Sequence, residues 1–159
     1  MLITVNSEED MLRLGRYLAA ILREDDVVYL LGELGVGKTV LVRGLAHALG
    51  YEGRVTSPTF TIMNVYNSTP PIYHFDFYRL QSPDLADLGL EDYMESGGIS
   101  LVEWPQVGRN VLPREALCLE IRLREDDYDG ARQVQITARG EQYQEKLERL
   151  RQIVDFSDR

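Results

Sequence analysis

The chain of 159 residues is short of several features, and each shortage excludes something. It has a single cysteine, Cys118, so no disulfide can form within it, and we expect a reducing, cytoplasmic setting with Cys118 as an ordinary strand residue. No apolar run approaches the roughly 18 residues of a membrane-spanning helix, so we expect no membrane contact. The formal net charge of −9 has the wrong sign for a protein that holds DNA or RNA mainly through phosphates.

Lysine is also scarce. Of the 17 basic residues only Lys38 and Lys146 are lysines, and Lys38 lies in a glycine-rich stretch. Lysine is a compact charge and arginine a rigid fork, so the two are not interchangeable at a phosphate site. Neither lysine belongs to the Asn/Thr-Lys-x-Asp motif with which guanine-specific proteins read their base. This absence favours ATP over GTP.

The stretch Gly32–Thr39 has the pattern Gly-x4-Gly-Lys-Thr of a phosphate-binding P-loop. Its glycines let backbone amides turn inward around a triphosphate, Lys38 supplies charge near the β- and γ-phosphates, and the Thr39 hydroxyl can ligate Mg²⁺. The context agrees, because residues 27–31 predict a buried strand and residues 38–49 predict a helix. We therefore predict a nucleotide site formed by Leu34, Gly35, Val36, Gly37, Lys38, Thr39 and Val40.

The remaining pattern predicts an α/β fold. Apolar residues recur at helical spacing in 8–23 and 141–154, and residues 81–98 are acidic with short helical pieces. Residues 117–123 and 134–138 alternate with period 2, which predicts a half-exposed antiparallel hairpin. Further strands are predicted at 2–5, 62–66, 72–78 and 99–102. We predict one domain over 1–159, a three-layer P-loop NTPase fold with a mostly parallel sheet and a C-terminal antiparallel hairpin.

Two carboxylates are candidates for the metal ligand that a P-loop needs at the end of another strand. Glu103 follows the apolar run 99–102, and Asp76 lies among aromatic residues in the stretch His74–Arg79. An acid with apolar neighbours is unfavourable unless partners offset its burial, and a metal site would do so. Surface acids or simple ion pairs are the alternative interpretation.

Three further features have more than one interpretation. The hydroxyl-rich loop 56–61 could sense the γ-phosphate as a switch, or it is an ordinary turn before a strand. His74 is a candidate catalytic base, although a packed or hydrogen-bonded strand histidine is the more common case. Trp104 could pack on nucleotide, on a partner or in the core.

Four blocks of the chain together resemble the TsaE (YjeE) family of small bacterial ATPases, which are needed to form threonylcarbamoyladenosine on tRNA. The blocks, in matching order and spacing, are Gly32–Thr39, Val55–Thr61, Tyr73–Leu80 and Leu101–Pro105. Many families share the first block. The Ser-Pro-Thr, His-Phe-Asp and Val-Glu-Trp triplets inside the other three are specific when they occur together.

The resemblance implies an ATPase that works with the TsaB and TsaD proteins, of which TsaD holds the transferase chemistry for adenosine 37. The tRNA would then be reached only through these partners. The resemblance also implies that Thr39 and Glu103 bind Mg²⁺ and that Asp76 serves ATP hydrolysis. We predict Asp76, Lys38 and Glu103 as the catalytic residues. Two further residues would approach the nucleotide, Glu8 and Arg132.

Two other functions remain open at this point. A small-molecule kinase of the P-loop class would need an acceptor pocket and usually a lid that carries arginine. The only candidate lid, residues 81–98, contains no arginine or lysine. A nucleotide-controlled binding module, in which hydrolysis is only a timer, is the third possibility.

Overall fold

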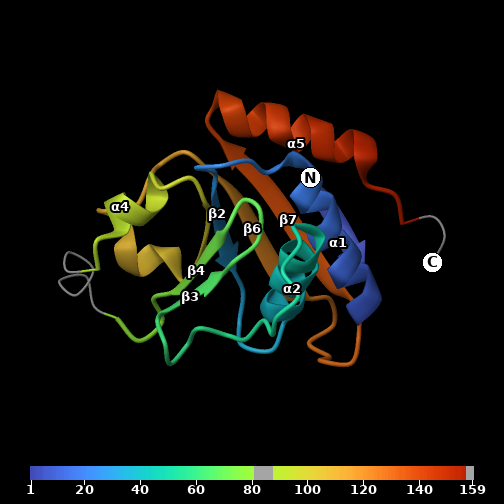
Figure 1. Cartoon of the computed structure of the whole chain (residues 1–159). Coiled ribbons are helices and arrows are strands. Elements are labelled where there is room, and N and C mark those ends of the chain that lie inside the picture. Colours follow the sequence, from blue (N-terminus) through green and yellow to red (C-terminus); the bar gives the residue numbers. More distant parts are fainter. Residues whose placement is uncertain (81–87, 157–159) are drawn as a thin grey trace.

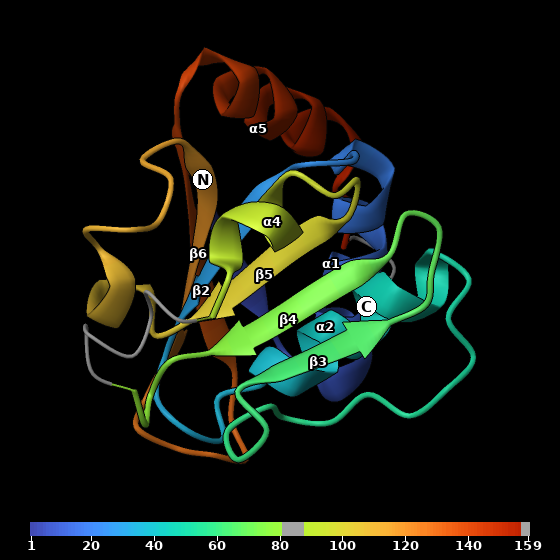
Figure 2. The same cartoon turned by 60° about the vertical axis from the view of Figure 1, so that its left-hand side comes forward.

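The computed structural model describes residues 1–80 and 88–156. Within these residues seven strands form one sheet in the order β1-β7-β6-β2-β5-β4-β3 (Figures 1 and 2). The strands are β1 (Leu2–Val5), β2 (Val27–Leu31), β3 (Met63–Tyr66), β4 (Ile72–Asp76), β5 (Ile99–Glu103), β6 (Ala116–Leu123) and β7 (Arg132–Arg139). The helices are α1 (Glu8–Ile21), α2 (Lys38–Ala48), α4 (Leu90–Met94), α5 (Glu141–Ile153) and the 3-10 helix η1 (Pro105–Gly108).

The centre of the sheet is parallel and both edges are antiparallel. Strand β2 lies between β5 and β6 and runs parallel to both, and β5 is also parallel to β4. The pairs β1–β7, β6–β7 and β3–β4 are antiparallel. The α/β fold with a parallel centre and a β6–β7 hairpin was therefore predicted correctly. The pairing of β1 with β7 was not predicted, because the sequence of a strand does not specify which other strand it pairs with.

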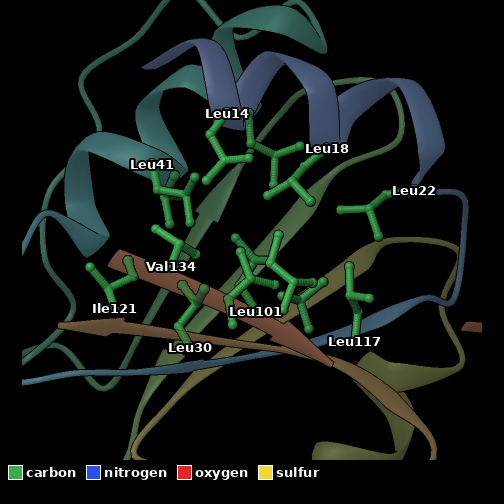
Figure 3. Close-up of a cluster of buried hydrophobic side chains, with 14 of the residues drawn as sticks. Leu14, Leu18, Leu22, Leu30, Leu41, Leu101, Leu117, Ile121 and Val134 are labelled. Carbon is green, nitrogen blue, oxygen red and sulfur yellow. The ribbon is translucent and has the colours of Figure 1, made fainter. Parts of the chain in front are cut away.

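Helices cover the two faces of the sheet unequally, which gives the predicted three layers. Helices α1, α2 and α5 cover one face over the larger apolar cluster. Figure 3 shows Leu14 and Leu18 of α1 and Leu41 of α2 pointing toward strand residues such as Leu30 and Leu101. The other face holds a smaller cluster that includes residues of α4 and the segment after η1. None of the helices in the described ranges is long and apolar enough to cross a membrane.

Two glycines let α1 and α2 cross at close range. A Cβ built on Gly44 would lie 2.3 Å from the carbonyl oxygen of Leu12, and one on Gly15 would lie 2.4 Å from that of Leu41. Both obstacles are backbone atoms, which cannot rotate away. The crossing therefore requires glycine at both positions, and it fixes the helix that begins at the P-loop.

Most element boundaries lie within a few residues of the predicted ones. Helix α1 ends at Ile21 instead of residue 23, and Ser7 caps its start by accepting a hydrogen bond from the Asp10 amide at 3.1 Å. Strand β4 ends at Asp76 instead of Tyr78, because Asp76 Oδ1 accepts the Tyr78 amide at 2.9 Å and turns the chain. In the predicted helical segment 81–98, α4 is one short helix, and residues 81–87 lie outside the described residues.

Candidate nucleotide site

The structure contains the predicted strand, glycine loop and helix, which follow one another as β2, the loop 32–37 and α2. Gly35 and Gly37 have φ of +81° and +114°, in the left-handed region that favours glycine. A Cβ on Gly32 would lie 2.7 Å from the Ile121 carbonyl oxygen. The backbone thus forms a loop that side chains would distort, at the carboxyl end of a central parallel strand.

Lys38 is the first residue of α2 and is buried. Its Nζ donates a hydrogen bond to the Gly32 carbonyl oxygen at 2.6 Å and lies 3.3 Å from Glu103 Oε1. It also lies 5.6 Å from the centroid of the Trp104 ring. These contacts hold the ammonium group between the glycine loop and the end of β5.

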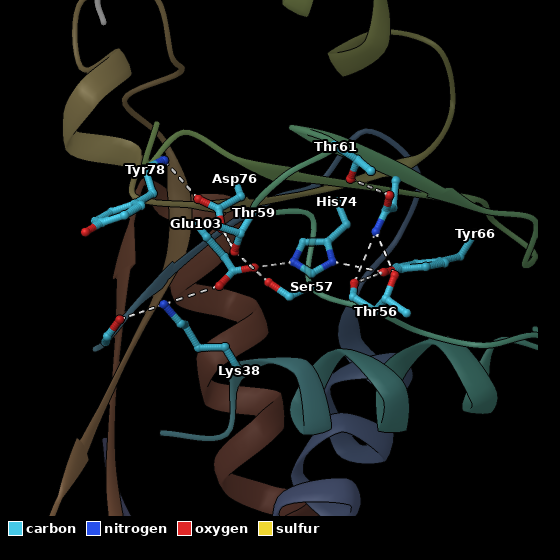
Figure 4. Close-up of polar contacts among 12 residues, drawn as sticks. Lys38, Thr56, Ser57, Thr59, Thr61, Tyr66, His74, Asp76, Tyr78 and Glu103 are labelled. Carbon is cyan, nitrogen blue, oxygen red and sulfur yellow. Dashed lines mark hydrogen bonds and ion pairs between the residues drawn. The ribbon is translucent and has the colours of Figure 1, made fainter. Parts of the chain in front are cut away.

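Glu103 is the last residue of β5 and is 3% exposed. Its Oε2 lies 2.7 Å from His74 Nε2, and the other ring nitrogen of His74 lies 3.2 Å from the Tyr66 hydroxyl (Figure 4). Burial raises the pKa of Glu103, but His74 and Lys38 together outweigh burial and hold it below its ordinary value. Glu103 is therefore a carboxylate at neutral pH, as a cation ligand must be.

Asp76 ends β4 and faces Glu103 across the parallel β4–β5 pair. It is 2% exposed, and its Oδ2 accepts a hydrogen bond from the Thr59 hydroxyl at 2.9 Å. The Thr59 hydroxyl in turn lies 2.8 Å from that of Ser57. The structure thus brings both candidate carboxylates to the edge of the sheet where Lys38 lies, as Figure 4 shows, and ties the loop 56–61 to one of them.

The loop 56–61 is also tied to the second carboxylate through a longer chain of contacts. The Tyr66 hydroxyl donates to the Thr56 carbonyl oxygen at 2.9 Å and reaches Glu103 through His74. Asn64 Nδ2 donates to the same carbonyl at 3.1 Å. His74 is therefore a hydrogen-bonded strand histidine, the more common of its two interpretations.

A cavity of about 320 Å³ adjoins the other side of the glycine loop. Glu8 and Arg132, which the resemblance pointed to, both line it together with Gly35, Val36, Gly37 and Val40. Arg132 Nε donates to the Val36 carbonyl oxygen at 3.1 Å, and Glu8 Oε1 lies 3.3 Å from Arg43. Two residues 124 positions apart in sequence thus line one cavity beside the predicted loop.

Trp104 lies at the margin of the site, next to the end of β5. Its φ of +56° is unusual for a residue other than glycine and marks a strained turn into η1. The indole N–H has no hydrogen-bond partner among the described residues, and the ring lies 4.9 Å from that of Tyr78. With Gly32 and Glu33, Trp104 lines a cavity of about 540 Å³.

The residues of this site fit a nucleoside triphosphate with Mg²⁺. The glycine loop and Lys38 suit phosphate oxygens, and the Thr39 hydroxyl and Glu103 carboxylate are the oxygen ligands that Mg²⁺ prefers. Thr39 is the second residue of α2 and is partly buried; Leu34, at the tip of the loop, is 55% exposed. No three His, Cys, Asp or Glu side chains of the described ranges form a metal cluster of their own, so phosphate and water would complete the coordination.

Sequence reasoning did not find the partners of the two carboxylates. His74 and Asp76 were both placed on the strand 72–78, but the contact of His74 with Glu103 depends on which strand lies beside β4 and in which register. Register between β4 and β5 is set by residues far apart in the chain, so no local pattern reports it.

Comparison with known proteins decides the family. Residues 5–134 match the family model described as "Threonylcarbamoyl adenosine biosynthesis protein TsaE". This chain belongs to the TsaE family. A TsaE protein of Haemophilus influenzae is 40% identical over 141 residues, which cover 84% of this chain and 87% of the relative. A TsaE protein of Bacillus subtilis is 40% identical over 148 residues, which cover 92% and 90%.

The fold comparison agrees. A crystal structure of Bacillus subtilis YdiB superposes with a TM-score of 0.82 at 33% sequence identity, covering 96% of this chain and 94% of YdiB. The TsaE relatives carry the name "tRNA threonylcarbamoyladenosine biosynthesis protein". The resemblance stated from the four sequence blocks is therefore confirmed, and the matched region contains every predicted site residue.

Proposed function

We propose that this member of the TsaE family is a Mg²⁺-dependent ATPase that acts with TsaB and TsaD in forming threonylcarbamoyladenosine at adenosine 37 of tRNA. The observation that carries the proposal is the buried Lys38–Glu103 pair at the mouth of the glycine loop, with Asp76 on the neighbouring strand. Two buried carboxylates and one buried ammonium at the carboxyl edge of a parallel sheet are suited to phosphate and divalent cation.

In this proposal each residue has a distinct task. The amides of residues 34–40 and the Lys38 ammonium bind the phosphates, and Thr39 and Glu103 hold Mg²⁺, which neutralises charge on the transferred phosphoryl group. Asp76 orients the attacking water, because its Oδ atoms already accept fixed hydrogen bonds and hold the carboxylate in one orientation. Glu8 and Arg132 lie on the side of the loop that would receive the nucleoside.

The loop 56–61 connects nucleotide to partner in this proposal. Its contacts with Asp76, through Thr59, and with Glu103, through Tyr66 and His74, would change when those carboxylates engage metal and water. A ligand shifts such an equilibrium only by its different affinity for the two loop states. Phe60, at 79% exposure, is the apolar side chain that the loop offers to a partner.

The test is modification of unmodified tRNA by purified TsaB and TsaD with and without this protein, ATP and Mg²⁺. We expect modification to require all of these, and to fall at least about 100-fold with Asp76→Asn, because the water-orienting group is lost. A control variant, Arg54→Gln, changes an exposed arginine outside the site and should modify tRNA normally. Phosphorylation of a metabolite, with no effect on tRNA, would instead favour the small-molecule kinase.

A further inference from the structure

Three arginines line one cavity on the face of the sheet that carries η1. The cavity measures about 610 Å³, and Arg109, Arg114 and Arg139 line it without any aspartate or glutamate. All three side chains are exposed, and none of them forms an ion pair in the described part of the chain. In a chain of net charge −9, three like charges around one cavity are a local concentration of positive charge.

The cavity is built on fixed elements. Arg139 ends β7, and the Tyr29 hydroxyl of β2 donates a hydrogen bond to the Pro113 carbonyl oxygen, which anchors the segment that carries Arg109 and Arg114. Burial raises the pKa of the Cys118 thiol and of the Tyr29 hydroxyl, and Arg139 is close enough to oppose this effect in both. The floor is therefore neutral and partly apolar, and the charge is at the rim.

Acidic hollows adjoin this basic cavity on two sides. One shares Leu112 and Pro113 with it and carries the acidic residues Glu24, Asp25, Glu91, Glu95 and Glu115. The other shares Leu31 and Gln106 with it and carries Glu33, Glu120 and Asp126 beside a single arginine. A long polyanion such as RNA would extend over these carboxylates and be repelled by them, whereas a compact anion would fit within the basic cavity; such repulsion between exposed charges acts over about one Debye length of roughly 8 Å.

We propose that the cavity lined by Arg109, Arg114 and Arg139 is a second ligand site, separate from the P-loop, for a compact and multiply charged oxyanion. Arginine forks bind phosphate and carboxylate oxygens in pairs, and a volume of about 610 Å³ is that of a small-molecule site. The site shares Leu31 and Gln106 with the cavity beside Gly32 and Trp104, so an occupant would lie next to the nucleotide site, but the lining of the site contains no residue of the glycine loop and neither Asp76 nor Glu103. This site is independent of the proposed ATPase activity.

The experiment follows the Nε–Hε signals of the arginine side chains by NMR during titration with pyrophosphate and, separately, with citrate. The background is Lys38→Ala, which removes the P-loop's own phosphate ligand. We expect saturable shifts of the Arg109, Arg114 and Arg139 signals by one anion or both. Arg114→Glu and Arg139→Glu should each weaken binding at least about tenfold, because each removes charge-assisted hydrogen bonds.

The matched control is Arg54→Glu, the same change of charge on an exposed arginine of the segment between α2 and β3, which Figure 2 shows across the molecule from η1. This variant should alter anion binding less than about twofold, because salt screens an exposed charge that lies far from the cavity. If Lys38→Ala does not fold, the titration is made with the wild type, and the arginine variants separate the two sites. Normal ATP affinity of Arg114→Glu and Arg139→Glu with Lys38 present shows that they are folded.

Two results would overturn the proposal. One is the absence of saturable shifts with either anion, or equal binding by the arginine variants and the control. The other is a short RNA hairpin that shifts the same three signals, displaces pyrophosphate and shows a steeper salt dependence, because the surface would then contact several nucleic-acid phosphates.

Discussion

Lys38 is the residue on which the nucleotide proposal depends most. Its ammonium already has two oxygen partners in a buried setting, so it is held where phosphate oxygens would approach. Lys38→Ala should weaken ATP binding at least about 100-fold, because the charge-assisted hydrogen bonds from the ammonium group to the phosphate oxygens are lost. Isothermal calorimetry measures this directly, and the emission of Trp104, the only tryptophan, is a second readout.

The chain supplies a matched control for that variant in its other lysine. Lys146 is also buried, and its Nζ lies 3.0 Å from Asp26 Oδ2, which precedes β2, whereas the P-loop follows the other end of that strand. Lys146→Ala should reduce stability as any broken buried pair does, yet leave ATP affinity nearly unchanged. Near-normal ATP affinity of folded Lys38→Ala would remove the P-loop assignment.

The two carboxylates should separate into different roles. Glu103→Gln should weaken Mg²⁺-dependent ATP binding about tenfold or more, because an amide oxygen is a poorer ligand than a carboxylate. Asp76→Asn should keep ATP affinity within about threefold and lower turnover about 100-fold or more, because it removes a group that acts on the water. Calorimetry with and without Mg²⁺, together with single-turnover kinetics, distinguishes them. The opposite pattern would exchange the assignments of Glu103 and Asp76.

At the scale of elements, the crossing of α1 and α2 determines where the P-loop helix lies. Gly44→Ala should destabilise the fold by about 1–3 kcal/mol, because its Cβ meets the Leu12 backbone and cannot be accommodated by a rotamer change. His47→Ala, on the exposed side of the same helix, should change stability by less than about 0.5 kcal/mol. Urea unfolding of both variants checks this. Equal stabilities would show that the helices can move apart freely.

The same elements show how far sequence reasoning reached. The run 27–31, the glycine loop and the helix after it were readable because their signals are local: a buried strand, positive-φ positions and helical spacing. Strands β6 and β7 were readable from alternation alone. Only β7 is half-exposed as predicted; residues 116–119 of β6 are buried on both faces, because β6 lies inside the sheet between β7 and β2. The need for glycine at positions 15 and 44 could not be predicted, because a close helix crossing depends on two segments about 30 residues apart.

The candidate site divides in a similar way. Lys38, Thr39, Asp76 and Glu103 were found by motif and by the expectation of acids at strand ends, and Glu8 and Arg132 only through family resemblance. The bridge from Tyr66 through His74 to Glu103 could not be predicted, because it depends on which strands are neighbours and in which register. The exposed arginines of the second cavity carried no local signal of any kind.

For the whole molecule, the lowered pKa of Glu103 makes stability depend on pH in a defined direction. A carboxyl group whose pKa is lower in the folded state adds stability above its unfolded value of about 4.3, and this contribution is lost as pH falls through the folded value. As the pH falls below about 5, the free energy of unfolding of the wild type should therefore decrease more than that of Glu103→Gln. Urea titrations at several pH values test this, and parallel losses in the two proteins would contradict it.

The last prediction concerns turnover by the isolated chain. An arginine that stabilises the developing charge on the phosphoryl group raises the rate by about 10³–10⁵. The arginine nearest to Asp76 in sequence is Arg79, and its guanidinium lies 4.5 Å from the centroid of the exposed Phe60 ring, in a contact between two surface loops. We therefore expect the protein alone to hydrolyse ATP at less than about 1 per second, at the low end of enzyme turnover.

Addition of TsaB and TsaD should raise this rate, because partners that bind Phe60 would release Arg79 or supply their own arginine. Phe60→Ala should reduce the stimulation and leave ATP affinity intact. Leu2→Ala, which removes another exposed apolar side chain on β1 at the opposite edge of the sheet, should reduce the stimulation less. Fast turnover by the isolated chain that TsaB and TsaD leave unchanged would show that the transition-state machinery is complete in one polypeptide.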